Sequence, residues 1–159
     1  MTTALHGSTT GLVFLGAYEQ ILEKEYGKER ATALTEMVMQ SVAQAHAKMI
    51  KEESGLQEFD LVFLHAIIPG LLYENMGIEF SAVEQTANTI VYNVGRCPVY
   101  ESSVLLGFEP TAIESRCRAT GLKYLEAVLK ELNPKASVEL DSFRSSPSEP
   151  CQESFVISQ

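Results

Sequence analysis

The residues best suited to chemistry in this chain are its three cysteines, Cys97, Cys117 and Cys151. We expect each of them at an element boundary or on an inward face: Cys97 ends a predicted strand just before a proline, Cys117 lies on the inner face of a late helix, and Cys151 opens the last strand. Neutral thiols pack as small apolar side chains, whereas thiolates bind zinc or act as nucleophiles. The cysteines therefore leave three interpretations open: buried packing, a metal site or a nucleophile.

The metal interpretation brings the three thiolates together and adds a fourth ligand from Asp141, Glu139 or His65. Thiolates suit zinc, but this spacing is not diagnostic of a zinc site.

The nucleophile interpretation requires a cation that lowers the thiol pKa of Cys97 or Cys117. Arginines stand next to both cysteines in the sequence, namely Arg96, Arg116 and Arg118. The well-known local signatures, such as a glycine-rich phosphate loop, a His-x-x-x-His pair or a Gly-x-Ser-x-Gly elbow, are missing from the sequence. Any chemistry therefore comes from dispersed residues.

Three other polar residues are further candidates. His65 lies in the apolar run Leu61–Leu72, where a histidine is more often a core residue hydrogen-bonded to the backbone than a catalytic base. Glu84 and Glu101 are possible general acids or bases, although any exposed strand carries such carboxylates.

The composition indicates a single globular domain over residues 1–159, with a net charge of −9 from 12 basic and 21 acidic residues. Such a charge repels phosphate polyanions and anionic membrane surfaces, so we expect neither nucleic acid nor membrane partners. No apolar stretch approaches the ~20 residues of a membrane span, and no secretion signal opens the chain. An odd number of widely spaced cysteines indicates reduced thiols in the cytoplasm.

The hydrophobic pattern predicts about four helices and about four antiparallel strands, hence an α+β fold. The first predicted helix follows possible N-caps at 8–10 and ends at Gly27. The second covers 28–53 and the third the apolar run 60–73. The fourth runs from Pro110 to Asn133-Pro134. On the second helix an apolar stripe is predicted at Leu34, Met37, Val38, Val42, Ala45 and Met49. Two strands are predicted within 78–94 around a turn at 86–88, and two more at 136–143 and 151–157.

The C-terminal half resembles a known family over roughly Ile90–Ile157. The residues that carry the resemblance are Tyr92-Asn93-Val94-Gly95-Arg96-Cys97-Pro98-Val99-Tyr100-Glu101, Leu106-Gly107, Cys117, Asn133-Pro134, Phe143-Arg144 and Cys151. This pattern resembles the L-2-amino-thiazoline-4-carboxylic acid hydrolases. Those enzymes resemble in turn the 4-vinyl reductase type ligand-binding domains and the small α/β subunits of vesicle-tethering complexes, whose members are typically dimers.

The resemblance implies a hydrolase that opens a C–N bond in a small, N- or S-heterocyclic carboxylate. In it Cys97 is the nucleophile or a metal ligand, Cys117 and Cys151 line or complete the site, and Tyr100 orients the substrate. Substrate-binding roles fall to Arg96 or Arg144, which would hold the carboxylate, and to His65.

Two positions depart from the family patterns. Thr120 stands where the hydrolases commonly carry an acidic residue three positions after the helix cysteine. The 4-vinyl reductase type sensors hold zinc with several cysteines, and here Phe143 replaces one of them, which leaves Cys117 and Cys151 as the possible zinc ligands.

An alternative function is a non-catalytic, sensor-like domain that binds a small molecule in an apolar pocket between helices and sheet. A third class, a scaffold subunit that acts through its surface, stays open because a fold does not choose a function. The resemblance and the apolar surplus of Leu61–Leu72 and Leu12–Tyr26 predict a homodimer.

Overall fold

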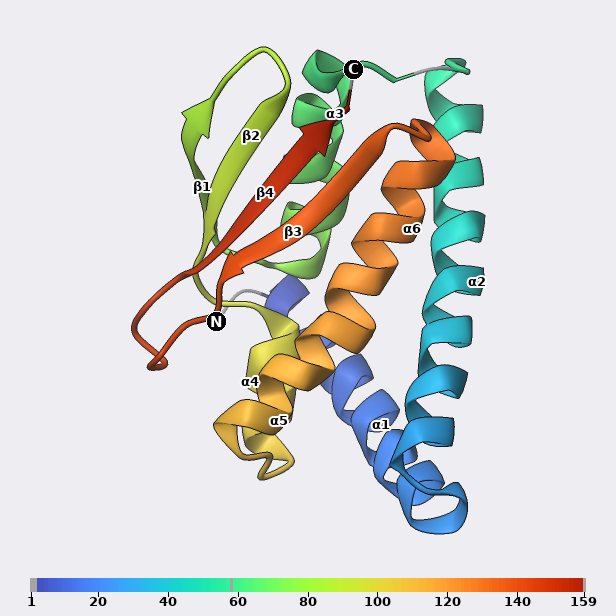
Figure 1. Ribbon diagram of the computed structural model, residues 1–159, viewed down its shortest axis with the longest axis vertical. Helices are drawn as coiled ribbons and strands as arrows, with labels where there is room; N and C mark the ends of the chain where they lie inside the picture. Colours follow the sequence, from blue (N-terminus) through green and yellow to red (C-terminus); the bar gives the residue numbers. More distant parts are fainter. Residues whose placement is uncertain (1–2, 58, 159) are drawn as a thin grey trace.

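The computed structural model describes residues 3–57 and 59–158. One layer is a four-stranded antiparallel sheet in the order β1-β2-β4-β3 (Figure 1). Its strands are β1 (Phe80–Gln85), β2 (Thr89–Val94), β3 (Ala136–Ser142) and β4 (Cys151–Ile157). The α+β prediction, with an antiparallel sheet of four strands, is confirmed.

The two central strands present alternate residues to the helices. Ile90, Tyr92 and Val94 of β2 are buried, and they stand opposite Phe155, Glu153 and Cys151 of β4 respectively. Alternate side chains of a strand point to one face, so this register places one carboxyl and one thiol among apolar neighbours.

Two long helices form a pair, α1 (Thr3–Tyr26) and α2 (Lys28–Ser54): in Figure 1 α1 lies below the sheet, and α2 runs along the right side of the molecule from bottom to top. Gly27 separates the two helices with a positive φ of 83°, which ends α1 where the sequence predicts. The start of α1 differs from the prediction, because the helix begins before Ser8. Thr10 does not cap it: its hydroxyl donates back to the carbonyl of His6 one turn earlier.

The predicted apolar stripe of α2 is wrong. Met37, Val38, Val42 and Met49 are exposed, with 63% of Met37 accessible. The buried face consists instead of small or short side chains, with Ile50 at its end: Ala31, Thr35, Ala43, Ala47 and Ile50. Small side chains let α2 lie close along α6 (Lys123–Leu132), which is the helix beside it in Figure 1.

The run 60–73 forms a short helix, α3 (Leu61–Ile67), followed by a π-helical segment, η1 (Ile68–Glu74). The Asp60 carboxylate accepts a hydrogen bond from the Phe63 amide and so caps α3. Pro69 stands in the first turn of η1, where its missing amide donor costs little, so the helical path continues with a change of geometry.

The sequence prediction missed one helix, α4 (Pro98–Leu105): Cys97 does not end a strand, because β2 ends at Val94, and it caps this helix instead. The late helical run divides into α5 (Pro110–Cys117), a π-helical turn η2 (Arg118–Leu122) and α6. The buried side chains of this run include Ile113, Leu125, Val128 and Leu132.

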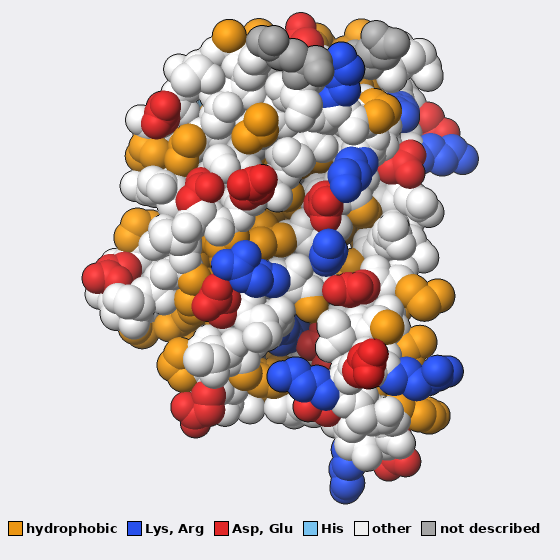
Figure 2. Space-filling model, viewed as in Figure 1, with side chains coloured by type: hydrophobic (Ala, Val, Ile, Leu, Met, Phe, Trp, Pro, Cys, Tyr) orange, Lys and Arg blue, Asp and Glu red, His pale blue; other side chains and the backbone are white. Residues whose placement is uncertain are grey.

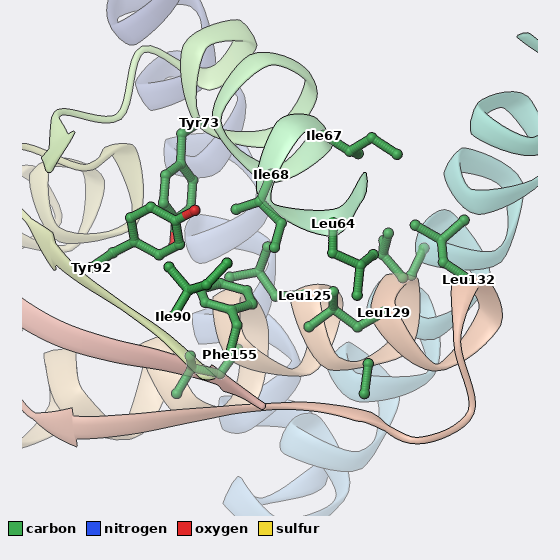
Figure 3. Packing of buried hydrophobic residues seen from close by; sticks show 14 of the residues in the cluster. Leu64, Ile67, Ile68, Tyr73, Ile90, Tyr92, Leu125, Leu129, Leu132 and Phe155 are labelled. Carbon is green, nitrogen blue, oxygen red and sulfur yellow. The ribbon is translucent and has the colours of Figure 1, made fainter. Parts of the chain in front are cut away.

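The core lies between the sheet and the helices η1 and α6 (Figure 3). Its aromatic centre consists of Tyr73, Tyr92 and Phe155, whose rings meet edge to face with centroids 5.5 to 6.4 Å apart. Within the described part of the chain, no helix has the length and apolarity that crossing a membrane requires.

Candidate functional site

A small cavity of about 50 Å³ lies beside this core, between the inner face of the sheet and the late helical run. Its wall is mostly apolar, with a few polar groups: Tyr73, Met76, Ile78, Val94, Cys97, Val99, Cys117, Gly121, Leu122, Tyr124, Leu125 and Glu153. A water molecule needs roughly 10–15 Å³ of such space, so the cavity admits a few water molecules or a small chemical group.

The polar centre of the cavity is Glu153, which the alternation of β4 turns inward. The side chain is buried, and its Oε2 accepts a hydrogen bond of 2.6 Å from the hydroxyl of Tyr73 on η1. Burial raises the pKa of the Glu153 carboxyl, and this effect outweighs the opposing effects of the Tyr73 hydrogen bond and the Arg144 guanidinium. A raised pKa shifts this carboxyl toward its protonated form, which donates a hydrogen bond as well as accepting one.

Two of the three cysteines lie on this cavity. Cys97 lies three residues after the end of β2, caps α4, and accepts a hydrogen bond from the Tyr100 amide at its Sγ. Burial raises the pKa of the Cys97 thiol to about 11, although that amide and Arg144 lower it in part. Burial likewise raises the pKa of Cys117 well above its usual range. Both thiols are therefore neutral near pH 7, which is the opposite of the lowered pKa that an activated nucleophile needs.

The third cysteine belongs to a neighbouring cluster around Arg144. The Arg144 guanidinium is buried and donates to the Sγ of Cys151 at 3.3 Å and to the carbonyls of Val94 and Gly95. It also lies 4.5 Å from the ring centre of Tyr100. These contacts join the end of β2 to the start of β4. Neither Arg144 nor Tyr100 lines the cavity.

The other predicted site residues lie apart from the cavity lining. Arg96 forms a half-exposed ion pair with Glu101 at 2.9 Å. His65 on α3 shares a hydrogen bond of 2.6 Å with the hydroxyl of Tyr92 and stacks against its ring. The structure thus brings Cys97 and Cys117 together on one cavity and separates Arg96, Arg144, Tyr100 and His65 from it.

No group of three or more His, Cys, Asp or Glu side chains within residues 3–57 and 59–158 is arranged to hold a metal ion. Cys117 faces the cavity, whereas the thiol of Cys151 faces Arg144. A structural zinc site needs four converging donors, and zinc binding by Cys117 and Cys151 stays a prediction.

The sequence analysis missed three residues of this site, Glu153, Tyr73 and Gly121. Glu153 carried a signal, because the strand alternation that turns Cys151 and Phe155 inward also turns Glu153 inward. Tyr73 and Gly121 belong to π-helical segments, whose altered phase no helical periodicity of 3.6 residues indicates.

Comparisons with known proteins complete the description of the site. No protein-family model matches the chain, and neither does any curated protein sequence. The predicted hydrolase family therefore finds no support.

Solved structures do match. A trafficking protein particle complex subunit 3 from Naegleria fowleri, covalently bound to palmitic acid, superposes with a TM-score of 0.64 at 11% identity, over 96% of both chains. The phenol-responsive sensory domain of the transcription activator PoxR, with phenol, superposes with a TM-score of 0.62 at 14% identity, over 92% of this chain and 74% of that one. These likenesses confirm the predicted fold, that of 4-vinyl reductase type domains and vesicle-tethering subunits.

Proposed function

We propose that this chain is a non-catalytic, sensor-like domain that binds a small molecule in the cavity beside Glu153. The observation that carries the proposal is a buried carboxyl, paired with one tyrosine hydroxyl, in the wall of an otherwise apolar cavity. Ligand sites commonly combine an apolar wall with a few convergent polar groups that fix orientation. The two structural neighbours, one with phenol and one with palmitic acid, support a fold that accommodates small organic molecules.

The lining selects the chemistry of the ligand. The described lining residues include no lysine, arginine or histidine, so an anionic ligand would meet Glu153 and two thiols without a compensating cation. An uncharged hydroxyl, carbonyl or amide instead forms a hydrogen bond with the Glu153 carboxyl, while an apolar body contacts Val94, Val99 and Leu122.

This proposal replaces the hydrolase as the leading function. A cysteine hydrolase needs a thiolate, whereas burial keeps the thiols of Cys97 and Cys117 neutral. A substrate carboxylate would need a free cation, whereas Arg144 already binds two carbonyls and a thiol.

Binding of four probes tests the proposal: phenol, benzyl alcohol, benzamide and benzoate, each measured by calorimetry and by saturation-transfer NMR. We expect the three uncharged probes to bind and benzoate to bind at least about tenfold more weakly, a difference of about 1.4 kcal/mol. Benzoate binding as tightly as phenol, or no binding by any probe, contradicts the proposal.

Two glycine variants locate the binding. Gly121→Leu places a side chain in the cavity wall and should abolish binding; Gly121→Ala is the milder version, since its Cβ would make an ordinary contact of 3.5 Å with Val99. Gly11→Leu is the matched control, because the space around Gly11 on α1 is open. Equal binding in the Gly121→Leu and Gly11→Leu proteins shows that the ligand lies elsewhere.

We further propose that the domain acts as a homodimer in a reducing, cytoplasmic environment. Large apolar side chains are exposed on α1 and α2, and Figure 2 shows hydrophobic side chains gathered at the lower right, over this helical pair. The exposed large apolar side chains of the two helices include Phe14, Tyr18, Ile21, Tyr26, Met37, Val38, Val42 and Met49. A second copy would cover them, and the three free cysteines fit a reducing compartment.

A further inference from the structure

The cavity beside Glu153 is much smaller than a typical ligand pocket. Its 50 Å³ compares with about 300–1,000 Å³ for sites that hold a whole small molecule. A ligand that places its polar end at Glu153 therefore extends beyond this cavity, and the neighbouring space decides its shape.

A groove of about 420 Å³ lies close by, between the α1–α2 pair and the α5–η2 segment. Figure 2 shows a hollow on this side of the molecule with basic and acidic side chains recessed in it. The groove is lined by Glu19, Gln20, Glu23, Lys28, Ala31, Thr32, Thr35, Phe108, Ala112, Ser115, Arg116, Ala119 and Thr120.

The charged groups of the groove largely compensate one another. The buried Arg116 guanidinium binds Glu19 at 2.7 Å, the hydroxyls of Ser102 and Ser103 at 3.0 and 2.8 Å, and the carbonyl of Leu12 at 2.9 Å, so most of its donors are already used. Glu23 and Lys28 contribute one charge of each sign. The groove therefore favours uncharged polar groups, which Gln20, Thr32 and Ser115 would contact, and an apolar body beside Phe108.

A single π-helical turn separates the groove from the cavity. Ala119 and Thr120 face the groove, whereas Cys117, Gly121 and Leu122 face the cavity. The two hollows thus share η2 as a wall.

The local structure of η2 favours a wall that moves. Segments of π-helix are rare and occur often at functional sites. The Thr120 hydroxyl donates to the carbonyl of Arg116 at 2.7 Å, a back-bond that weakens and bends helices. Gly121 adds backbone freedom in the same turn.

We propose that the groove and the cavity are two halves of one ligand site, which join when η2 opens. The ligand is accordingly an elongated, uncharged molecule with a hydrogen-bonding group at each end and an apolar middle. This inference rests on the proposed function, but the opening of η2 can be tested without any ligand.

The test uses the thiol of Cys117 as a probe of the opening. Methyl methanethiosulfonate transfers its CH₃S group to a thiolate: a new S–S bond forms, methanesulfinate leaves, and the thiol proton passes to the buffer. The native full-length protein is treated, and the rate of labelling at Cys117 is followed by peptide mass spectrometry. Cys151, whose thiol lies against Arg144 rather than on the cavity, serves as the internal reference.

Two variants fill the groove from opposite walls, Ala119→Trp on η2 and Thr32→Trp on α2. We expect each to slow labelling of Cys117 by about tenfold, because the reagent enters from the groove when the wall opens. Benzyl methanethiosulfonate should be slowed more than the methyl reagent, since a benzyl group on Cys117 extends into the groove. Circular dichroism checks that each variant is folded, and Thr32→Trp alone suffices if Ala119→Trp is not.

The control is Glu139→Trp, which fills a separate hollow between η2–α6 and β3 that also touches Leu122. We expect unchanged labelling of Cys117 in this variant. Equal slowing by Glu139→Trp and Thr32→Trp, or no slowing by Thr32→Trp, overturns the proposed route through η2. Because no ligand takes part, failure here differs from failure of the probe-binding experiment.

Discussion

Replacing Arg116 tests how the structure fastens α1 to the rest of the fold. The Arg116 side chain is 5% exposed, and it donates to the Glu19 carboxylate, to the hydroxyls of Ser102 and Ser103, and to the carbonyl of Leu12 at 2.9 Å. Removing one partner of a buried ion pair leaves an uncompensated charge and costs about 3–5 kcal/mol. We therefore expect Arg116→Met to lower the free energy of unfolding by that amount.

The double variant separates the lost charge pair from the lost packing. Glu19 is 14% exposed, so its charge is poorly solvated once Arg116 is absent. In Arg116→Met with Glu19→Gln no buried charge remains, and we expect the loss to shrink by at least ~2 kcal/mol. Arg118→Met is the matched control: its i,i+4 pair with Glu114 is exposed, and such pairs contribute about 0–1 kcal/mol.

Urea unfolding followed by circular dichroism measures all four proteins, wild type and the three variants, and Glu19→Gln alone closes the cycle. The reasoning is refuted if Arg116→Met costs no more than Arg118→Met. It is also refuted if the double variant is no more stable than Arg116→Met alone, since the uncompensated charge would then not be the cause.

Three further predictions follow from single features of the structure. The raised pKa of Glu153 means that the folded state holds its proton to higher pH than the unfolded state. The stability that the Glu153 proton contributes is complete below about pH 4.5 and falls as pH rises. Glu153→Gln should therefore gain stability relative to wild type between pH 4 and pH 7, as measured by urea unfolding. A difference in stability that stays constant with pH refutes this. Gly77→Ala should lower the free energy of unfolding by more than Gly107→Ala, because both glycines have φ near +70° but a Cβ at Gly77 would stand 2.2 Å from the Leu5 amide nitrogen; equal losses contradict the close approach. Light scattering should give twice the chain mass of 17.5 kDa at micromolar concentration, and a mass of one chain rules out the stable dimer.

The strands were predictable because their signal is local. The hairpin of β1 and β2 combines β-branched residues with the short turn at 86–88, and both features stand in adjacent sequence. The start of α4 could not be predicted from the sequence, because Cys97-Pro98 fits a turn as well as the first turn of a helix. The difference depends on the Cys97 thiol accepting the Tyr100 amide, a contact that forms only with the helix.

The α2 face shows where hydrophobic periodicity fails. Met37 and Val42 have larger apolar surfaces than Ala43 and Ala47, so the sequence pattern assigns the wrong face to the core. Close packing against α6 selects small side chains instead, and that choice depends on the partner helix. The candidate site was also predictable only in part. Cys97 and Cys117 were found by their residue type. The contact between Tyr73 and Glu153 joins residues 80 positions apart in the sequence, and no local pattern indicates it.

The central claim, that a small molecule binds beside Glu153, is tested most directly by a methyl NMR titration. The side chains of Val94, Val99, Leu122 and Leu125 line the cavity, and their labelled methyl groups report its contents without any variant. Titration with phenol should shift these methyl signals in a saturable manner and leave exposed Val62 unchanged. Shifts confined to exposed methyl groups, with the signals of the cavity methyls fixed up to saturating phenol, would contradict the account.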